Sequence, residues 1–262
     1  MSNPEIYITR WGSVGPRVVL VHGGAQGTKT GGDHHFSTQQ VLSERGWQLI
    51  VPDRPGHGRS ADPSRPDDAE IDGEWVAKLL EDGAHLVGHS FGGCVALAAA
   101  TRRPAAVRSL TLIEPGMQKL ATDNPDVRKF GLKLLTASLF SMSGTSRARK
   151  FMKVLGITPE VRGDLSPDEI EKMGRALAKL RVPAKDVLLR ELGVVKQAGI
   201  PLLVVTCGWS RAFEVTADAV AAAGGGDRQV IKSPHHFPQL VSDEFNQVLA
   251  TFMTAAGARQ RT

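Results

Sequence analysis

A serine in a glycine-rich segment is the residue of this sequence best suited to nucleophilic chemistry. Ser90 lies in Gly88–Gly92 (GHSFG), after an apolar run that predicts a strand and before an alanine-rich run that predicts a helix. Such a sharp strand-to-helix turn leaves no room for side chains beside the serine, which explains the two glycines. We expect the turn to hold Ser90 in a strained conformation at the edge of a sheet, above a helix N-terminus.

A serine hydroxyl needs a base to become an effective nucleophile, and the sequence offers eight histidines. The segment His236–Pro238 (HFP) follows the last predicted strand, where a loop can reach over the sheet edge toward Ser90. We predict His236 as the general base and His235 as a candidate for the pocket wall. The pair His34–His35 has no acidic or cysteine partner at metal-ligand spacing, so no metal site is predicted.

Short apolar runs alternate with helical patterns over most of the chain. Strands are predicted over Arg17–Val21, Trp47–Val51, Ala84–Gly88, Arg108–Ile113, Pro201–Thr206 and Arg228–Lys232. Helices are predicted over Phe36–Arg45, Asp68–Leu80, Phe91–Arg103, Ala217–Ala223 and Phe245–Ala255. This alternation is typical of an α/β fold with a mostly parallel sheet and helices on both faces.

Residues 116–200 interrupt the alternation, because they are helical and basic. They contain 16 Lys and Arg against 9 Asp and Glu, whereas the rest of the chain contains 16 and 18. A helical block inserted between two strands of a parallel sheet usually lies over the carboxyl edge of the strands. We therefore predict a core domain of residues 1–115 and 201–262, and a helical cap or lid of residues 116–200.

Four motifs in this order resemble the α/β-hydrolase superfamily over nearly the whole chain. They are the His22–Gly24 turn, Asp53–Ser60 (DRPGHGRS), the turn Gly88–Gly92 and the loop His236–Pro238. The resemblance implies an α/β-hydrolase fold with a serine nucleophile, a base and an acid. It also implies an oxyanion hole built from the backbone N–H groups of Gly24 and Phe91, with His22 supporting the turn.

The third member of the triad departs from the family pattern. Members usually carry the acid as Gly-x-x-Asp after the strand that follows the lid, where this sequence has Gly208–Arg211 (GWSR). We favour Glu114, at the end of the strand after the Ser90 helix, which is similar to the placement in dehalogenase-like and zearalenone-hydrolase-like branches. Glu214, three residues past the usual position, is the alternative acid. Trp209, in the same loop, is a candidate for the pocket wall.

The resemblance implies a serine hydrolase that cleaves an ester-like or lactone bond of a small organic substrate through an acyl-serine intermediate. This chemistry needs no cofactor. The same residues also support C–C bond hydrolysis, acyl transfer or haloperoxidase-like chemistry, and some proteins of this fold only bind ligands. The retained serine and histidine favour an enzyme.

Composition excludes several other classes of protein. Cys94 and Cys207, without a CxxC spacing, predict neither a disulfide scaffold nor a zinc ribbon. No apolar run approaches the ~20 residues of a membrane span, and the N-terminus has no signal-peptide pattern, so we expect a cytoplasmic protein without a membrane partner. The net charge of +5 comes with one tyrosine and no nucleic-acid motif, so no nucleic-acid partner is expected. We expect a monomer or a homodimer.

Overall fold

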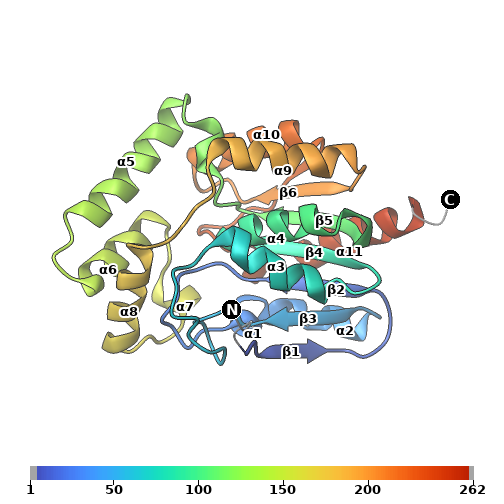
Figure 1. The fold of residues 1–262 in the computed structure, drawn as a ribbon, viewed down its shortest axis with the longest axis horizontal. Coiled ribbons are helices and arrows are strands. Elements are labelled where there is room, and N and C mark those ends of the chain that lie inside the picture. The colour runs from blue at the N-terminus through green and yellow to red at the C-terminus, as the bar shows by residue number, and fades with distance from the viewer. Residues whose placement is uncertain (1–4, 260–262) are drawn as a thin grey trace.

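A seven-stranded sheet forms the centre of the computed structural model, which describes residues 5–259 (Figure 1). The strands follow the spatial order β1-β3-β2-β4-β5-β6-β7. Their bounds are β1 Ile8–Trp11, β2 Arg17–Val21, β3 Gln48–Pro52, β4 Ala84–His89, β5 Val107–Ile113, β6 Leu202–Thr206 and β7 Asp227–Val230. All neighbouring strands pair in parallel except β1, which is antiparallel to β3. The predicted α/β class with a mostly parallel sheet is confirmed.

Helices cover both faces of the sheet because successive strand residues point to opposite sides. In β2, Val19 and Val21 pack into one apolar cluster, whereas Val18 and Leu20 pack into the other. The first cluster includes residues of α3 (Ala69–Leu79), α4 (Phe91–Arg102), α9 (Lys185–Gln197) and α10 (Arg211–Gly224). The second includes residues of α2 (Val41–Glu44) and α11 (Asp243–Arg259), and α1 (Gly32–His35) lies beside β3. No helix within residues 5–259 is long and apolar enough to cross a membrane.

Two elements differ from the sequence prediction. Strand β1 was not predicted, because Ile8–Trp11 is a half-buried edge strand without a continuous apolar run. The helix expected over Phe36–Arg45 is a short 3₁₀ turn, Ser37–Gln39, followed by α2. In this segment the side-chain amide of Gln39 donates to the Gln239 carbonyl and to Asn246, so contacts with the end of the chain replace a continuous helix.

Four helices form a cap at one end of the sheet (Figure 1). They are α5 (Pro125–Leu139), α6 (Gly144–Val154), α7 (Pro159–Arg162) and α8 (Pro167–Leu177). Ser166 caps α8, and Glu169 completes a capping box at the start of this helix. Helix α9 instead packs against α4 and α10, and its Leu188 and Leu192 join the core cluster. The helical segment of residues 116–200 thus divides between cap and core.

Candidate active site

The turn between β4 and α4 holds Ser90 in a strained conformation. Ser90 has φ 55° and ψ −121°, a combination that L residues rarely adopt. A Cβ on Gly92 would lie 2.3 Å from the Val21 carbonyl oxygen, and a Cβ on Gly88 would lie 2.4 Å from the Gly92 carbonyl oxygen. The Ser90 N–H donates to the Ile113 carbonyl over 2.9 Å, which ties the turn to β5. The glycines are therefore required by close backbone contacts.

Glu114 and His236 meet in the buried part of the site. His236 Nδ1 lies 3.1 Å from Glu114 Oε2, and the two side chains are 1% and 0% exposed. A carboxylate accepts hydrogen bonds, so Nδ1 carries the proton of the neutral imidazole and Nε2 carries a lone pair. His236 Nε2 has no hydrogen-bond partner among the described residues, and both His236 and Ser90 line the same cavity. The arrangement offers a base of fixed tautomer in the cavity that Ser90 also lines.

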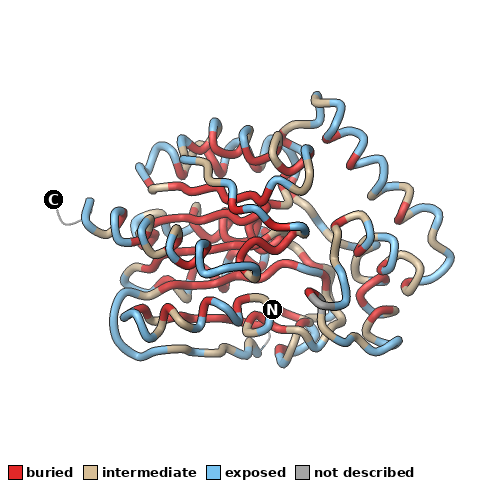
Figure 2. Tube along the Cα trace, turned by 180° about the vertical axis from the view of Figure 1, so that it is seen from behind, coloured by how far each residue is buried: buried red, intermediate tan, exposed pale blue. Residues whose placement is uncertain are grey.

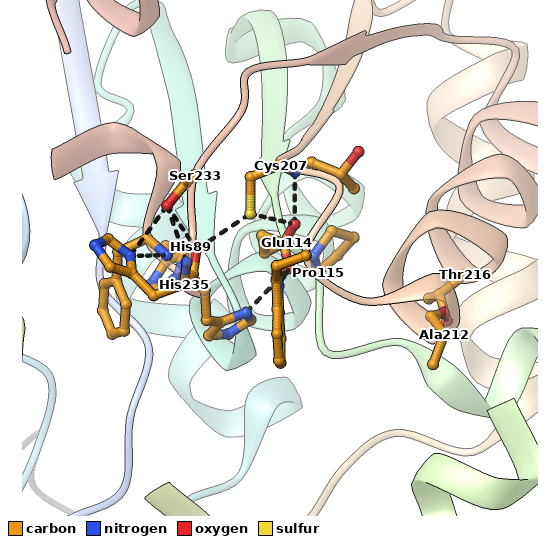
Figure 3. Close-up of polar contacts among 12 residues, drawn as sticks. His89, Glu114, Pro115, Cys207, Ala212, Thr216, Ser233 and His235 are labelled. Carbon is orange, nitrogen blue, oxygen red and sulfur yellow. Dashed lines mark hydrogen bonds and ion pairs between the residues drawn. The ribbon is translucent and has the colours of Figure 1, made fainter. Parts of the chain in front are cut away.

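Three donors on the loop after β6 hold the Glu114 carboxylate. The Trp209 indole N–H donates to Oε2 over 2.7 Å, the same oxygen that faces His236. The Cys207 backbone N–H and thiol donate to Oε1 over 2.9 and 3.1 Å (Figure 3). Burial alone raises the pKa of Glu114, but the hydrogen bonds from His236, Trp209 and Cys207 outweigh burial and keep this pKa below its ordinary value. Glu114 is therefore ionised at neutral pH despite its burial.

Glu214, the alternative acid, uses its carboxylate elsewhere. Its Oε1 accepts the Gly208 N–H over 3.0 Å. Its Oε2 accepts the Thr206 hydroxyl over 2.9 Å and the Arg228 guanidinium over 2.7 Å. These contacts tie the first turn of α10 to β6 and β7. The structure therefore brings the favoured Glu114, and not Glu214, into contact with His236.

Gly24 and Phe91 line the same cavity. Phe91 is the first residue of α4, where backbone N–H groups have no acceptor within the helix. His22 supports the Gly24 turn, because its Nδ1 donates to the Gly23 carbonyl and its Nε2 accepts the Arg54 N–H, each over 2.8 Å. Both residues whose N–H groups are expected to form an oxyanion hole thus line the Ser90 cavity.

A buried arginine supports Phe91, and the sequence reasoning did not single it out. The Arg54 guanidinium is fully buried, contacts Asp67 and lies 3.9 Å from Asp72. Its central carbon lies 4.8 Å from the centre of the Phe91 ring. A buried cation is stable only with such partners. Its position in the DRPGHGRS motif was the available signal, and the structure gives that motif a supporting role below the site.

The cavity beside Ser90 has a volume of about 160 Å³ and lies between the core loops and the cap. The segment of residues 125–182 contributes only apolar side chains to its lining. These are Phe130, Leu134, Phe151, Met152, Leu155, Ile157, Val161, Leu165, Met173, Leu177, Leu180 and Val182. No Asp, Glu, Lys or Arg is among the described residues that line it. The cavity therefore suits an uncharged and largely apolar group.

Histidines form much of the opposite wall. His34, His35, His57 and His89 line the cavity together with His236. Burial lowers the pKa of His35 to about 4 and that of His57 to about 3, so these rings are neutral at pH 7. Within the described chain, no group of three or more His, Cys, Asp or Glu side chains is arranged to hold a metal ion. His35 and His57 therefore make their part of the wall polar but uncharged.

Two residues predicted for the pocket wall lie outside it. Neither Trp209 nor His235 lines the cavity. Trp209 turns its indole N–H to Glu114 instead. His235 Nδ1 lies 3.1 Å from the Ser233 hydroxyl, within its own loop (Figure 3). The missing Asp in Gly208–Arg211 indicated that the acid lies elsewhere, but no sequence signal assigned the Trp209 indole to it.

Known proteins share this sequence pattern and this fold. A sequence model described as the alpha/beta hydrolase family matches residues 18–248. The chain is 28% identical to lipase LipV of Mycobacterium tuberculosis, over 97% of this chain and 87% of that protein. It is 35% identical to esterase Rv0045c of the same organism, over 40% of this chain and 35% of that protein. The protein therefore belongs to the alpha/beta hydrolase family.

Solved structures extend the comparison to the complete fold. The N-acyl homoserine lactonase AidH, complexed with N-butanoyl homoserine, superposes with a TM-score of 0.69 at 19% identity and covers 97% of each chain. The esterase EaEST of Exiguobacterium antarcticum gives a TM-score of 0.69 at 18% identity and covers 96% of this chain and 96% of its own. At these identities the similarity shows a shared fold.

Proposed function

We propose that this hydrolase cleaves an uncharged ester or lactone with an apolar acyl group, through an acyl-Ser90 intermediate. The observation that carries the proposal is the buried Glu114–His236 contact of 3.1 Å, in a cavity that Ser90 also lines. The strained turn at Ser90 supports the same role, because it presents the hydroxyl at the start of α4. The names of the relatives LipV and Rv0045c, a lipase and an esterase, agree with ester hydrolysis.

In the first half-reaction, His236 Nε2 takes the proton of the Ser90 hydroxyl as Oγ attacks the carbonyl carbon. Glu114 stabilises the imidazolium that forms, and the N–H groups of Gly24 and Phe91 stabilise the negative oxygen. The tetrahedral intermediate then breaks the ester C–O bond, and His236 gives its proton to the leaving oxygen. Water, activated by the same histidine, attacks the acyl-serine and releases the acid.

The cavity lining defines the substrate class. The cap wall is apolar, the His35 and His57 rings are neutral, and no Asp, Glu, Lys or Arg is among the described lining residues. A carboxylate on the acyl chain would lose its hydration there without a cation to replace it. An aliphatic acyl group gains the burial of its apolar surface. These features favour a small neutral ester or lactone with an aliphatic acyl chain.

Turnover of nitrophenyl esters tests the proposal. We expect the octanoate and butanoate esters to be hydrolysed, and a succinate half-ester of butanoate length to react at least about tenfold more slowly, as its charge must be desolvated. Ser90→Ala should lower kcat by at least about 10³-fold without changing the unfolding temperature, because its loss removes the nucleophile. Ser43→Ala, a serine of α2 outside the cavity, should retain wild-type activity. Retention of a tenth of the activity by Ser90→Ala, or a preference for the succinate, would contradict the proposal.

A further inference from the structure

The outer side of α5 and the turn after it expose a group of large apolar side chains. Leu132, Leu135, Leu139, Phe140 and Met142 are between 53% and 103% exposed. Among the described residues, these five are nearly half of the eleven exposed large hydrophobic residues of the chain. Figure 2 shows α5 at the edge of the molecule, with exposed residues along its outer side. We call these five residues the outer α5 patch.

The patch is a second apolar face on a helix that already buries one. Val127, Phe130 and Ala137 are buried on the inner side of α5. Leu132, Leu135 and Leu139 follow at spacings of three and four residues, so they share another side of the helix. A contiguous exposed apolar patch of this kind marks an interaction site more often than a solvated surface. Folding of the described chain leaves this face exposed.

The chain segment that carries the patch has charges of one sign. Residues 127–159 contain seven Lys and Arg and no Asp or Glu. The Lys150 ammonium donates to the Phe140 carbonyl over 2.7 Å, which places it beside the patch. The other exposed cations of this segment take no part in the ion pairs of the described chain; they are Arg128, Lys129, Lys133, Arg149 and Lys153.

We propose that the outer α5 patch docks peripherally on an anionic lipid surface. The apolar side chains would enter the boundary between headgroups and acyl chains, while the surrounding cations contact the headgroup phosphates. A second copy of the chain fits less well, because pairing two α5 helices would bring together three cations from each helix against a single carboxylate from each, Asp126. The expectation of no membrane partner was based on the missing spanning segment, and peripheral docking does not need one.

The docking surface and the Ser90 cavity are separate. None of the five residues of the outer α5 patch lines the cavity, whereas their neighbour Leu134 does. The proposal therefore stands independently of the reaction at Ser90. Substitutions in the patch should leave the hydrolysis of a water-soluble ester unchanged, so this activity also reports that a variant is folded.

Co-sedimentation with vesicles tests the proposal. We expect the wild-type protein to bind vesicles of equal parts phosphatidylcholine and phosphatidylglycerol, and to bind pure phosphatidylcholine at least about tenfold more weakly, since each cation near an anionic surface contributes about fivefold. Rising salt should weaken the binding. The double variant Leu135→Asp with Leu139→Asp should bind at least about tenfold more weakly. The matched control Val14→Asp with Leu189→Asp changes two exposed apolar residues on the surface of the core domain, away from α5, and should bind as the wild type does.

Several results would overturn the proposal. One is the absence of binding to the anionic vesicles, and another is equal binding to both kinds of vesicle. Equal losses in the α5 variant and its control would point to a general surface effect. A concentration-dependent dimer that the α5 variant abolishes, without vesicle binding by the wild type, would assign the patch to a second copy. If the α5 variant fails to fold, Lys129→Glu with Lys133→Glu should reduce anionic binding by at least about tenfold, and unchanged binding would refute the proposal.

Discussion

The buried histidines should make folding strongly dependent on pH below about 6.5. Burial lowers the pKa of His35 and His85 to about 4 and that of His57 to about 3. Burial also holds the pKa of His22 and of His89 well below the ordinary value. In the unfolded chain each of these rings titrates near about 6.5. Over this range the unfolded chain therefore binds protons that the native protein does not bind.

The sign and the size of the effect follow from proton linkage. Each depressed histidine pKa contributes stability that is present above the unfolded pKa and is lost as the pH falls below it. From about pH 7.5 to about pH 5.5 the loss is about 1.3 kcal/mol for each histidine, or about 6.5 kcal/mol for the five. Glu191 acts in the opposite direction, because burial raises its pKa to about 7 and the native carboxyl takes up a proton first. It offsets about 2 kcal/mol, which leaves a net loss of about 4.5 kcal/mol.

Urea denaturation at the two pH values measures this loss directly. A loss of about 4.5 kcal/mol is a large share of the roughly 5–15 kcal/mol that typically stabilises a native protein, so the urea midpoint should fall steeply. A change below about 1 kcal/mol, or greater stability at the lower pH, would refute the assignment of neutral buried histidines. The result also decides whether weak activity at acidic pH reflects unfolding or titration of the site.

Four substitutions follow from contacts in the site. Glu114→Gln should lower kcat by up to about 10⁴-fold, because an amide does not stabilise the His236 imidazolium. Glu214→Gln should lower kcat by less than about tenfold. If steady-state kinetics find the larger loss in Glu214→Gln, the triad acid is Glu214 instead. Trp209→Phe removes a donor from Glu114, which makes the carboxylate more basic, so the acid limb of kcat/KM should move to higher pH and kcat should fall about tenfold. An unchanged pH profile would limit Trp209 to packing. Gly92→Ala should destabilise the protein by about 1–3 kcal/mol in urea denaturation, because its Cβ meets backbone, and wild-type stability would contradict the turn geometry.

The sequence carried the parts of the site that depend on local spacing. The tight turn at Ser90 is predicted by the neighbouring glycines and by the strand and helix patterns on either side of it. Glu114 could be predicted from the sequence because it ends a buried strand beside that turn, and a carboxylate there needs a partner. His236 could be predicted from the sequence because the loop after the last parallel strand must lie at the same edge of the sheet.

Other features depend on contacts between distant segments and could not be predicted from the sequence. The Trp209 indole could not be assigned to Glu114, because its direction depends on how the loop after β6 turns. The same holds for the 3₁₀ turn that replaces a helix near Gln39, where the deciding partners are Gln239 and Asn246. For α5, the sequence showed apolar residues on more than one side, and only packing against the core decided which of them are buried.

Covalent labelling at Ser90 tests the central proposal most directly. A fluorophosphonate reacts readily only with a serine that has an activated hydroxyl and an adjacent oxyanion hole. Treatment of the folded protein, followed by digestion and mass spectrometry, should find one phosphonylated peptide, the one that contains Ser90. The label should be absent in Ser90→Ala and should form at least about 10³-fold more slowly in His236→Gln. A label on another serine, or no label on a folded protein that hydrolyses esters, would contradict the assignment of Ser90 as the nucleophile.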